Sequence, residues 1–184
     1  MIEGRRVILR SVRNSDIQYF LKWLDDPEIA LLLGRYFPTS EFDERRWLIE
    51  APERGDIIFT IIDKATGQPI GNCRFGGIDF KNQRAESGIL IGEKDYWGKG
   101  YGKEALELLV DYGFTELNLN SIYTLVISSN ERSIKTHKQI GFREQGRIRQ
   151  RIFMKNKFYD MIYFDLLKSE WLQRRKHIKN RTLF

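Results

Sequence analysis

Cysteine, histidine and long apolar runs are all scarce in this chain of 184 residues. Cys73 is the only cysteine, which excludes an internal disulfide, and its strand-like neighbours predict a small core side chain rather than a nucleophile. His137 and His177 are the only histidines, so we expect no zinc site. No apolar run approaches the roughly 20 residues of a membrane span. Residues 1–6 lack the pattern of a signal peptide, and a cytoplasmic protein is therefore expected.

Charged residues are abundant, and they give a formal net charge of +6 at pH 7. Basic residues crowd the segment 171–184, which we expect to form a basic tail behind a domain of residues 1–170, with Trp171 as its anchor and a mobile end. A second basic cluster lies at 143–151. Such a charge suits a nucleic acid, a membrane surface or an anionic ligand. Because no nucleic-acid-binding motif is present, a nucleic-acid module is the least favoured function class.

The order of the expected elements favours one mixed α/β domain. Apolar residues at helical spacing behind capping residues such as Ser40 and Asn130 predict helices, and β-branched runs predict strands. We expect a twisted, mostly antiparallel sheet of about seven strands with about four helices, and a parallel crossover around a glycine-rich helix. The expected strands cover residues 5–10, 57–62, 69–75, 86–91, 122–127, 142–153 and 159–167, and the helices begin near residues 16, 40, 103 and 130.

A glycine-rich segment, residues 97–103, joins an expected strand to an expected helix. Glycine tolerates positive φ and lets the backbone approach a ligand closely, and the first amides of a helix attract phosphate. We therefore infer a phosphate or pyrophosphate cradle, with a tight turn for close helix packing as the alternative. The spacing fits neither a P-loop nor a Rossmann fingerprint.

Two motifs carry a family resemblance. Trp97-Gly98-Lys99-Gly100-Tyr101-Gly102 resembles the acetyl-CoA pyrophosphate loop of the GNAT acetyltransferases, Gln/Arg-x-x-Gly-x-Gly/Ala, with Trp97 in place of Gln or Arg. Asn130-Glu131-Arg132-Ser133 followed by Gly141-Phe142 resembles a signature of the RimJ/RimL-like branch, which acetylates protein N-termini and has small-molecule-acetylating relatives. The resemblance implies a single GNAT-type domain. It also implies an acetyl-CoA-dependent N-acetyltransferase that transfers acetyl directly to a primary amine, without an acyl-enzyme and without a metal.

The same resemblance implies where acetyl-CoA would bind. The backbone of residues 89–91 would pair with the pantetheine arm like an added strand, an amide near Leu90 would polarise the thioester carbonyl, and Asn130 would hydrogen-bond the arm. The residues expected at acetyl-CoA are Ile89, Leu90, Ile91, Trp97, Gly98, Lys99, Gly100, Tyr101, Gly102, Lys103, Asn130 and Ser133.

Three side chains are candidates for proton transfer. Ala85-Glu86 resembles the Ala-Glu that opens this strand in relatives with a catalytic glutamate, so Glu86 is the candidate base, with a surface carboxylate paired to Arg84 as the alternative. His137 occupies the position that holds a tyrosine proton donor in many relatives. Ser133, one helical turn earlier, is the competing donor.

The amine acceptor stays open at this stage between a protein N-terminus, a nucleotide-activated amino sugar and an antibiotic-like amine. Its binding site would draw on residues 31–37 and on the closing hairpin, including several aromatic residues, with core packing as the alternative for at least half of them. A polyamine would need an acidic groove, and only scattered carboxylates stand out. A non-catalytic acetyl-CoA sensor is the second function class, and a homodimer stays open. The aromatic residues are Tyr36, Phe37, Phe153, Phe158 and Tyr159, next to Asp160, and the scattered carboxylates are Asp25, Asp26, Glu28, Glu41 and Asp43.

Overall fold

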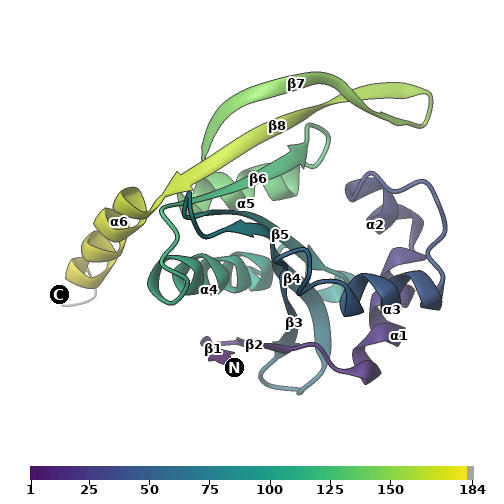
Figure 1. Ribbon diagram of the computed structural model, residues 1–184, viewed down its shortest axis with the longest axis horizontal. Helices are drawn as coiled ribbons and strands as arrows, with labels where there is room; N and C mark the ends of the chain where they lie inside the picture. The colour runs from purple at the N-terminus through teal and green to yellow at the C-terminus, as the bar shows by residue number, and fades with distance from the viewer. Residues whose placement is uncertain (182–184) are drawn as a thin grey trace.

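The computed structural model describes the backbone of residues 1–181 and the side chains as far as Arg175. The described chain forms one eight-stranded sheet with the order β1-β2-β3-β4-β5-β6-β8-β7 (Figure 1). The strands are β1 (Ile2–Glu3), β2 (Val7–Ser11), β3 (Ile57–Asp63), β4 (Pro69–Asp79), β5 (Arg84–Ile91), β6 (Ser121–Ile127), β7 (Arg143–Met154) and β8 (Lys157–Leu167). The helices are α1 (Ile17–Leu24), α2 (Pro27–Leu32), α3 (Glu41–Ile49), α4 (Tyr101–Thr115), α5 (Glu131–Ile140) and α6 (Lys168–Arg181), with short 3₁₀ turns η1 (Asn14–Asp16) and η2 (Lys94–Tyr96).

The sheet is antiparallel except between β5 and β6, which run parallel and are joined through α4. A parallel pair needs such a crossover, and its presence around the glycine-rich helix confirms the prediction. The pairing of β5 with β6 covers Arg84–Glu86 against Ser121–Tyr123 and does not continue to the ends of the two strands. Figure 1 shows β6, β8 and β7 turning away from β5. The backbone of Ser87–Ile91 is therefore left without a strand partner on its β6 side.

Two apolar clusters hold the layers together. In the main core, α4 packs across β2, β4 and β5, and buried residues such as Leu106, Phe114 and Phe75 lie between them. A smaller cluster of Phe20, Trp23 and Ile29 joins α1 and α2 to Leu90 of β5. Because alternate residues of a strand face opposite sides, the two clusters occupy opposite faces of β5.

Capping residues locate the starts of α3 and α5. Ser40 accepts a hydrogen bond from the Asp43 amide, and Asp43 accepts one from the Ser40 amide, which confirms the predicted capping box of α3. Asn130 caps α5 by accepting from the Ser133 amide at 3.1 Å, as predicted. Gly141 ends α5 in the left-handed region, with φ of +116°.

Cys73 is fully buried in the main core, as predicted, and burial raises the pKa of its thiol. A buried thiol that stays protonated is no nucleophile. None of the helices described is long and apolar enough to cross a membrane.

The mixed α/β class and the mostly antiparallel sheet are confirmed, but several elements were missed. Pro27 opens α2, a helix that was not expected, because proline fits the first helical turn and Asp26 caps it. The short β1 had no sequence signal of its own. Helix α6 spans the expected division at residue 171, and Trp171 is buried in the main core. The expected mobile end of the basic tail lies outside the described residues.

Candidate active site

Two adjoining cavities open where β5 and β6 diverge. One, here called the loop cavity, measures about 330 Å³ and is bordered by the glycine-rich loop and α5. The other, here called the helix cavity, measures about 460 Å³ and is bordered by α3 and by the open faces of β4, β5 and β6. The cavities share a wall made of Leu32, Leu33, Ile89, Leu90, Asn130, Ser133 and His137.

Most of the predicted cofactor-binding residues line the loop cavity. Ile89 and Leu90 line both cavities, and Ile91 lines the loop cavity alone. Lys99 and Tyr101 are not part of either wall: the Lys99 carbonyl and the Tyr101 ring both contact Arg6 instead. The predicted residues that the structure brings to the loop cavity are Ile89, Leu90, Ile91, Trp97, Gly98, Gly100, Gly102, Lys103, Asn130 and Ser133.

The loop has the backbone geometry that a cradle requires. Gly98 and Gly100 have φ of +72° and +85°, a region that side chains other than glycine rarely adopt. Gly100 is the N-cap of α4 and has no side chain to bond the first amides of the helix. A Cβ on Gly102 would lie 3.2 Å from Ile91 Cγ1, so glycine also permits close packing of α4 on β5. The close packing of Gly102 confirms the tight-packing interpretation, and the phosphate cradle stays a prediction that this backbone geometry permits.

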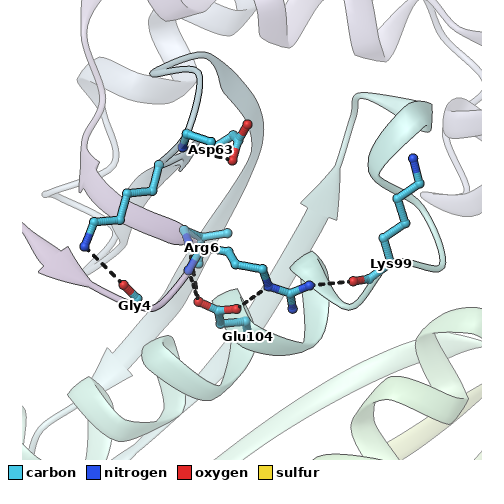
Figure 2. A network of polar contacts seen from close by, with 8 residues as sticks. Gly4, Arg6, Asp63, Lys99 and Glu104 are labelled. Carbon is cyan, nitrogen blue, oxygen red and sulfur yellow. Dashed lines mark hydrogen bonds and ion pairs between the residues drawn. The ribbon is translucent and has the colours of Figure 1, made fainter.

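Arg6 and Glu104 fix this loop to the N-terminal strands. The backbone amide and Nε of Arg6 donate to Glu104 at 2.7 Å and 2.9 Å, and Arg6 Nη1 donates to the Lys99 carbonyl at 2.8 Å (Figure 2). Burial alone would raise the pKa of Glu104, but the hydrogen bonds from Arg6 outweigh it and lower the pKa. This pair could not be predicted from the sequence, because its partners lie 98 residues apart and neither belongs to a motif.

Trp97 stands where the family loop has Gln or Arg, and the structure places a cation beside it. Its Nε1 donates to the Ile91 carbonyl at 2.6 Å, and the Arg132 guanidinium carbon lies 3.9 Å from the centre of its ring. Arg132, Lys103 and Lys135 line the loop cavity, and no carboxylate belongs to its described wall. The loop cavity is therefore cationic.

The helix cavity has the opposite charge balance. Its wall contains three carboxylates, Asp43, Glu44 and Glu86, against two guanidinium groups, Arg35 and Arg74. In the sequence, Asp43 looked like one of several scattered carboxylates and Glu44 went unnoticed. They come together with Glu86 because α3, β4 and β5 meet only in the folded chain. A net negative cavity beside a cationic one attracts a cation on one side and an anion on the other.

Glu86 lines the helix cavity and keeps about a third of its side chain exposed. Its nearest cation is Arg74, with Oε1 3.9 Å from Nη2. The predicted alternative, a pair with Arg84, is wrong, because Arg84 lies 3.4 Å from Asp79, its cross-strand partner on β4. The Glu86 carboxylate is thus open to the cavity.

His137 lies in the shared wall with only 2% of its surface exposed. Its Nδ1 lies 2.8 Å from the Ser133 carbonyl and 3.2 Å from Ser133 Oγ. Because a carbonyl only accepts, Nδ1 carries a proton and donates it there. Burial lowers the pKa of His137, and the hydrogen bond to Ser133 offsets only part of that effect, so the ring is neutral at pH 7. Its Nε2 is buried and has no hydrogen-bond partner among the described residues.

The structure does not bring the aromatic residues expected near the acceptor to either cavity. Tyr36, Phe37, Phe153, Phe158 and Tyr159 line neither cavity of the described chain. Phe153 and Phe158 form an exposed cross-strand pair near the tip of the β7–β8 hairpin, with ring centres 4.9 Å apart. The hairpin contributes Met161 to the helix cavity instead, and residues 32, 33 and 35 do come from the expected first segment. In the hairpin, strand register determines which side chains face the cavity, and this register could not be derived from composition.

Comparison with known proteins agrees with this geometry. The family model of the acetyltransferase (GNAT) domain matches residues 6–143. An N-acetyltransferase of Bacillus licheniformis, p20, is 35% identical, and the match covers 90% of this chain and 95% of that protein. The chain belongs to the GNAT acetyltransferase family, and it is an N-acetyltransferase.

Two further relatives carry a substrate in their names. Spermidine N(1)-acetyltransferase of Escherichia coli is 25% identical, with 96% of this chain and 94% of that protein covered. The structure of spermidine N-acetyltransferase from Vibrio cholerae, solved in complex with CoA and spermine, superposes with a TM-score of 0.84 at 22% identity. That match covers 92% of this chain and 99% of that one, and it establishes the GNAT fold for this chain.

Proposed function

We propose that this protein transfers acetyl from acetyl-CoA to the primary amine of a small molecule. One observation carries the proposal: a cationic cavity and a net acidic cavity share a single wall. Phosphate groups of CoA suit the first, an ammonium group suits the second, and the reacting atoms would meet at Leu90 and Ser133. The spermidine acetyltransferases among the relatives support a small-molecule acceptor.

The loop cavity fits CoA in its chemistry. Backbone amides of residues 98–103, at the start of α4, would bind the pyrophosphate. The family loop has Gln or Arg where this chain has Trp97, and Arg132, which stacks on Trp97, would supply the positive charge. The unpaired backbone of β5 beyond Glu86 would hydrogen-bond the pantetheine arm, beside Asn130. Acetyl-CoA would bring the acetyl group as a thioester, and an amide near Leu90 would polarise its carbonyl.

Proton transfer would divide between Glu86 and Ser133. Glu86 would take a proton, through water, from the ammonium of the bound acceptor, and the neutral amine would then attack the thioester. Neutral His137 has one N–H, and it is already donated to Ser133. We therefore assign the donor at the leaving sulfur to the Ser133 hydroxyl, whose hydrogen His137 Nδ1 cannot accept because Nδ1 itself carries a proton. His137 then positions Ser133.

The assignment of Ser133 as the proton donor predicts different activities for two variants. We expect Ser133→Ala to lower kcat by about 100-fold, because an oriented donor at the leaving group is lost. His137→Asn keeps an N–H near the position of Nδ1 without an ionisable ring, and we expect it to retain activity within about threefold and an unchanged pH profile. Steady-state kinetics across pH 6–9 measures both. The reverse pattern, a silent serine variant and an inactive asparagine variant, would make His137 the acid.

The acceptor class is tested with a panel. The purified protein is given acetyl-CoA with small aliphatic amines, amino sugars, or peptides with free N-termini, and release of the CoA thiol is followed. We expect kcat/KM for the best small amine to exceed that for any peptide by at least about tenfold. Preference for a peptide would move the function to protein N-termini, and tight CoA binding without turnover of any acceptor would favour a non-catalytic sensor.

A further inference from the structure

Glu44 is a buried carboxylate without a partner. It lies in the first turn of α3, retains 5% of its surface exposure and lines the helix cavity. Among the described residues no hydrogen bond or ion pair reaches its carboxylate. The neighbouring acids differ: Asp43 is engaged by Ser40, with Oγ at 2.5 Å from Oδ2, and Glu86 keeps a third of its side chain in solvent.

A buried unpaired carboxylate is costly for the folded state. Burial removes much of the water that would solvate the charge, and buried charges are normally paired. Burial raises the pKa of Glu44, and the charge of Arg35 counteracts only part of that rise. Arg35 itself donates to Thr39 Oγ1 at 2.5 Å and forms no ion pair with Glu44. No contact within the described protein offsets the cost of burying the Glu44 carboxylate. This points to a contact between Glu44 and a ligand.

The location of Glu44 defines which ligand atom it can reach. It lines the helix cavity from α3, whereas the shared wall where the acetyl group would be transferred is formed by residues of α2, β5 and α5 and their ends. Apolar side chains of Leu24, Trp47 and Met161 line the same cavity. An acceptor that reaches both the shared wall and Glu44 therefore needs an apolar spacer between two polar ends.

We propose that Glu44 binds a second cationic nitrogen of the acceptor, so that the acceptor is an aliphatic diamine or polyamine. The reacting amine lies near Glu86 and Ser133, a methylene chain crosses the apolar part of the cavity, and the distal ammonium pairs with Glu44. Glu44 is largely buried, so one charge-assisted contact there contributes more than it would on an exposed surface. This inference rests on the proposed function and specifies its substrate class.

The test compares acceptors of equal length with one and two amines. For the unmodified protein, we expect kcat/KM for 1,5-diaminopentane to exceed that for pentylamine by at least about tenfold. Glu44→Gln, which keeps the size of the side chain, should lower the diamine value by about tenfold and change the pentylamine value less than about threefold. Glu41→Gln is the control, because Glu41 lies on the same helix, is exposed and pairs with Arg45 at 2.6 Å.

Two failures can be told apart. Equal use of diamines and monoamines by the unmodified protein, or an equal loss of both in Glu44→Gln, would overturn the role of Glu44 while acetyl transfer to small amines stands. Absence of acetylation of any small amine would remove the proposed function and this inference together. Thermal unfolding checks that Glu44→Gln folds, and loss of an unpaired buried charge should leave its midpoint unchanged or higher.

Discussion

Gly100→Glu is expected to weaken acetyl-CoA binding by at least about 100-fold, which corresponds to about 2.7 kcal/mol. Gly100 has φ of +85°, where any side chain adds strain, and a Cβ there would lie 3.0 Å from Arg6 Nη2. The new carboxylate would stand at the start of α4, where the phosphate of CoA is proposed to bind. It would also compete for Arg6, which otherwise supports the Lys99 carbonyl and Glu104.

Gly67→Glu is the matched control for this experiment. Gly67 has φ of +72° and lies in the turn between β3 and β4, and a Cβ there would meet no atom within 4 Å. It carries the same backbone penalty and the same added charge without touching the loop. Isothermal titration of acetyl-CoA into the unmodified protein and the two variants measures the effect. Equal affinity of Gly100→Glu and Gly67→Glu would remove the cradle from residues 97–103.

Gly92→Ala is expected to lower the free energy of unfolding by about 3 kcal/mol. A Cβ on Gly92 would lie 2.0 Å from Cδ2 of Trp23, a distance that no packed side chain tolerates. Trp23 cannot yield easily, because it is buried and its Nε1 donates to Glu93 at 2.8 Å. The strain would fall on the contact between α1 and the end of β5, the strand that carries Leu90 to the shared wall of the cavities.

Denaturant unfolding with Gly146→Ala as control measures this effect. A Cβ on Gly146 would meet no atom within 4 Å, so the control isolates the general effect of replacing glycine. Identical midpoints for the two variants would show that the close packing of Gly92 on Trp23 does not contribute to stability.

Local signals predicted much of the fold. The caps at Ser40 and Asn130 and the glycines before α4 each act over a few residues, so their consequences could be derived from the chain alone. Helix α6 could not, because its run of basic residues has the composition of a solvated tail, and burial of Trp171 becomes visible only in the folded core. The position of residues 89–91 beside the glycine loop was predicted through the family resemblance.

Long-range contacts defined the part of the site that was not predicted. In the sequence, Glu104 has the pattern of an ordinary helix residue and Arg132 has that of a surface charge. Their contacts with Arg6 and Trp97 form only in the folded chain. Glu44 gave no signal, since nothing in the sequence of α3 tells that its carboxylate faces a cavity. Charge balance within a cavity depends on which elements meet there, and that is a property of topology rather than of spacing along the chain.

The most direct test of acetyl transfer follows the acetyl group itself. The protein is mixed with isotopically labelled acetyl-CoA and a primary diamine for less than one turnover, and both the amine and the intact protein are weighed by mass spectrometry. Direct transfer between two bound substrates predicts labelled acetyl-amine and a protein of unchanged mass. A labelled protein would mean an acyl-enzyme, and bound acetyl-CoA without any labelled amine would contradict the assignment of this site as catalytic.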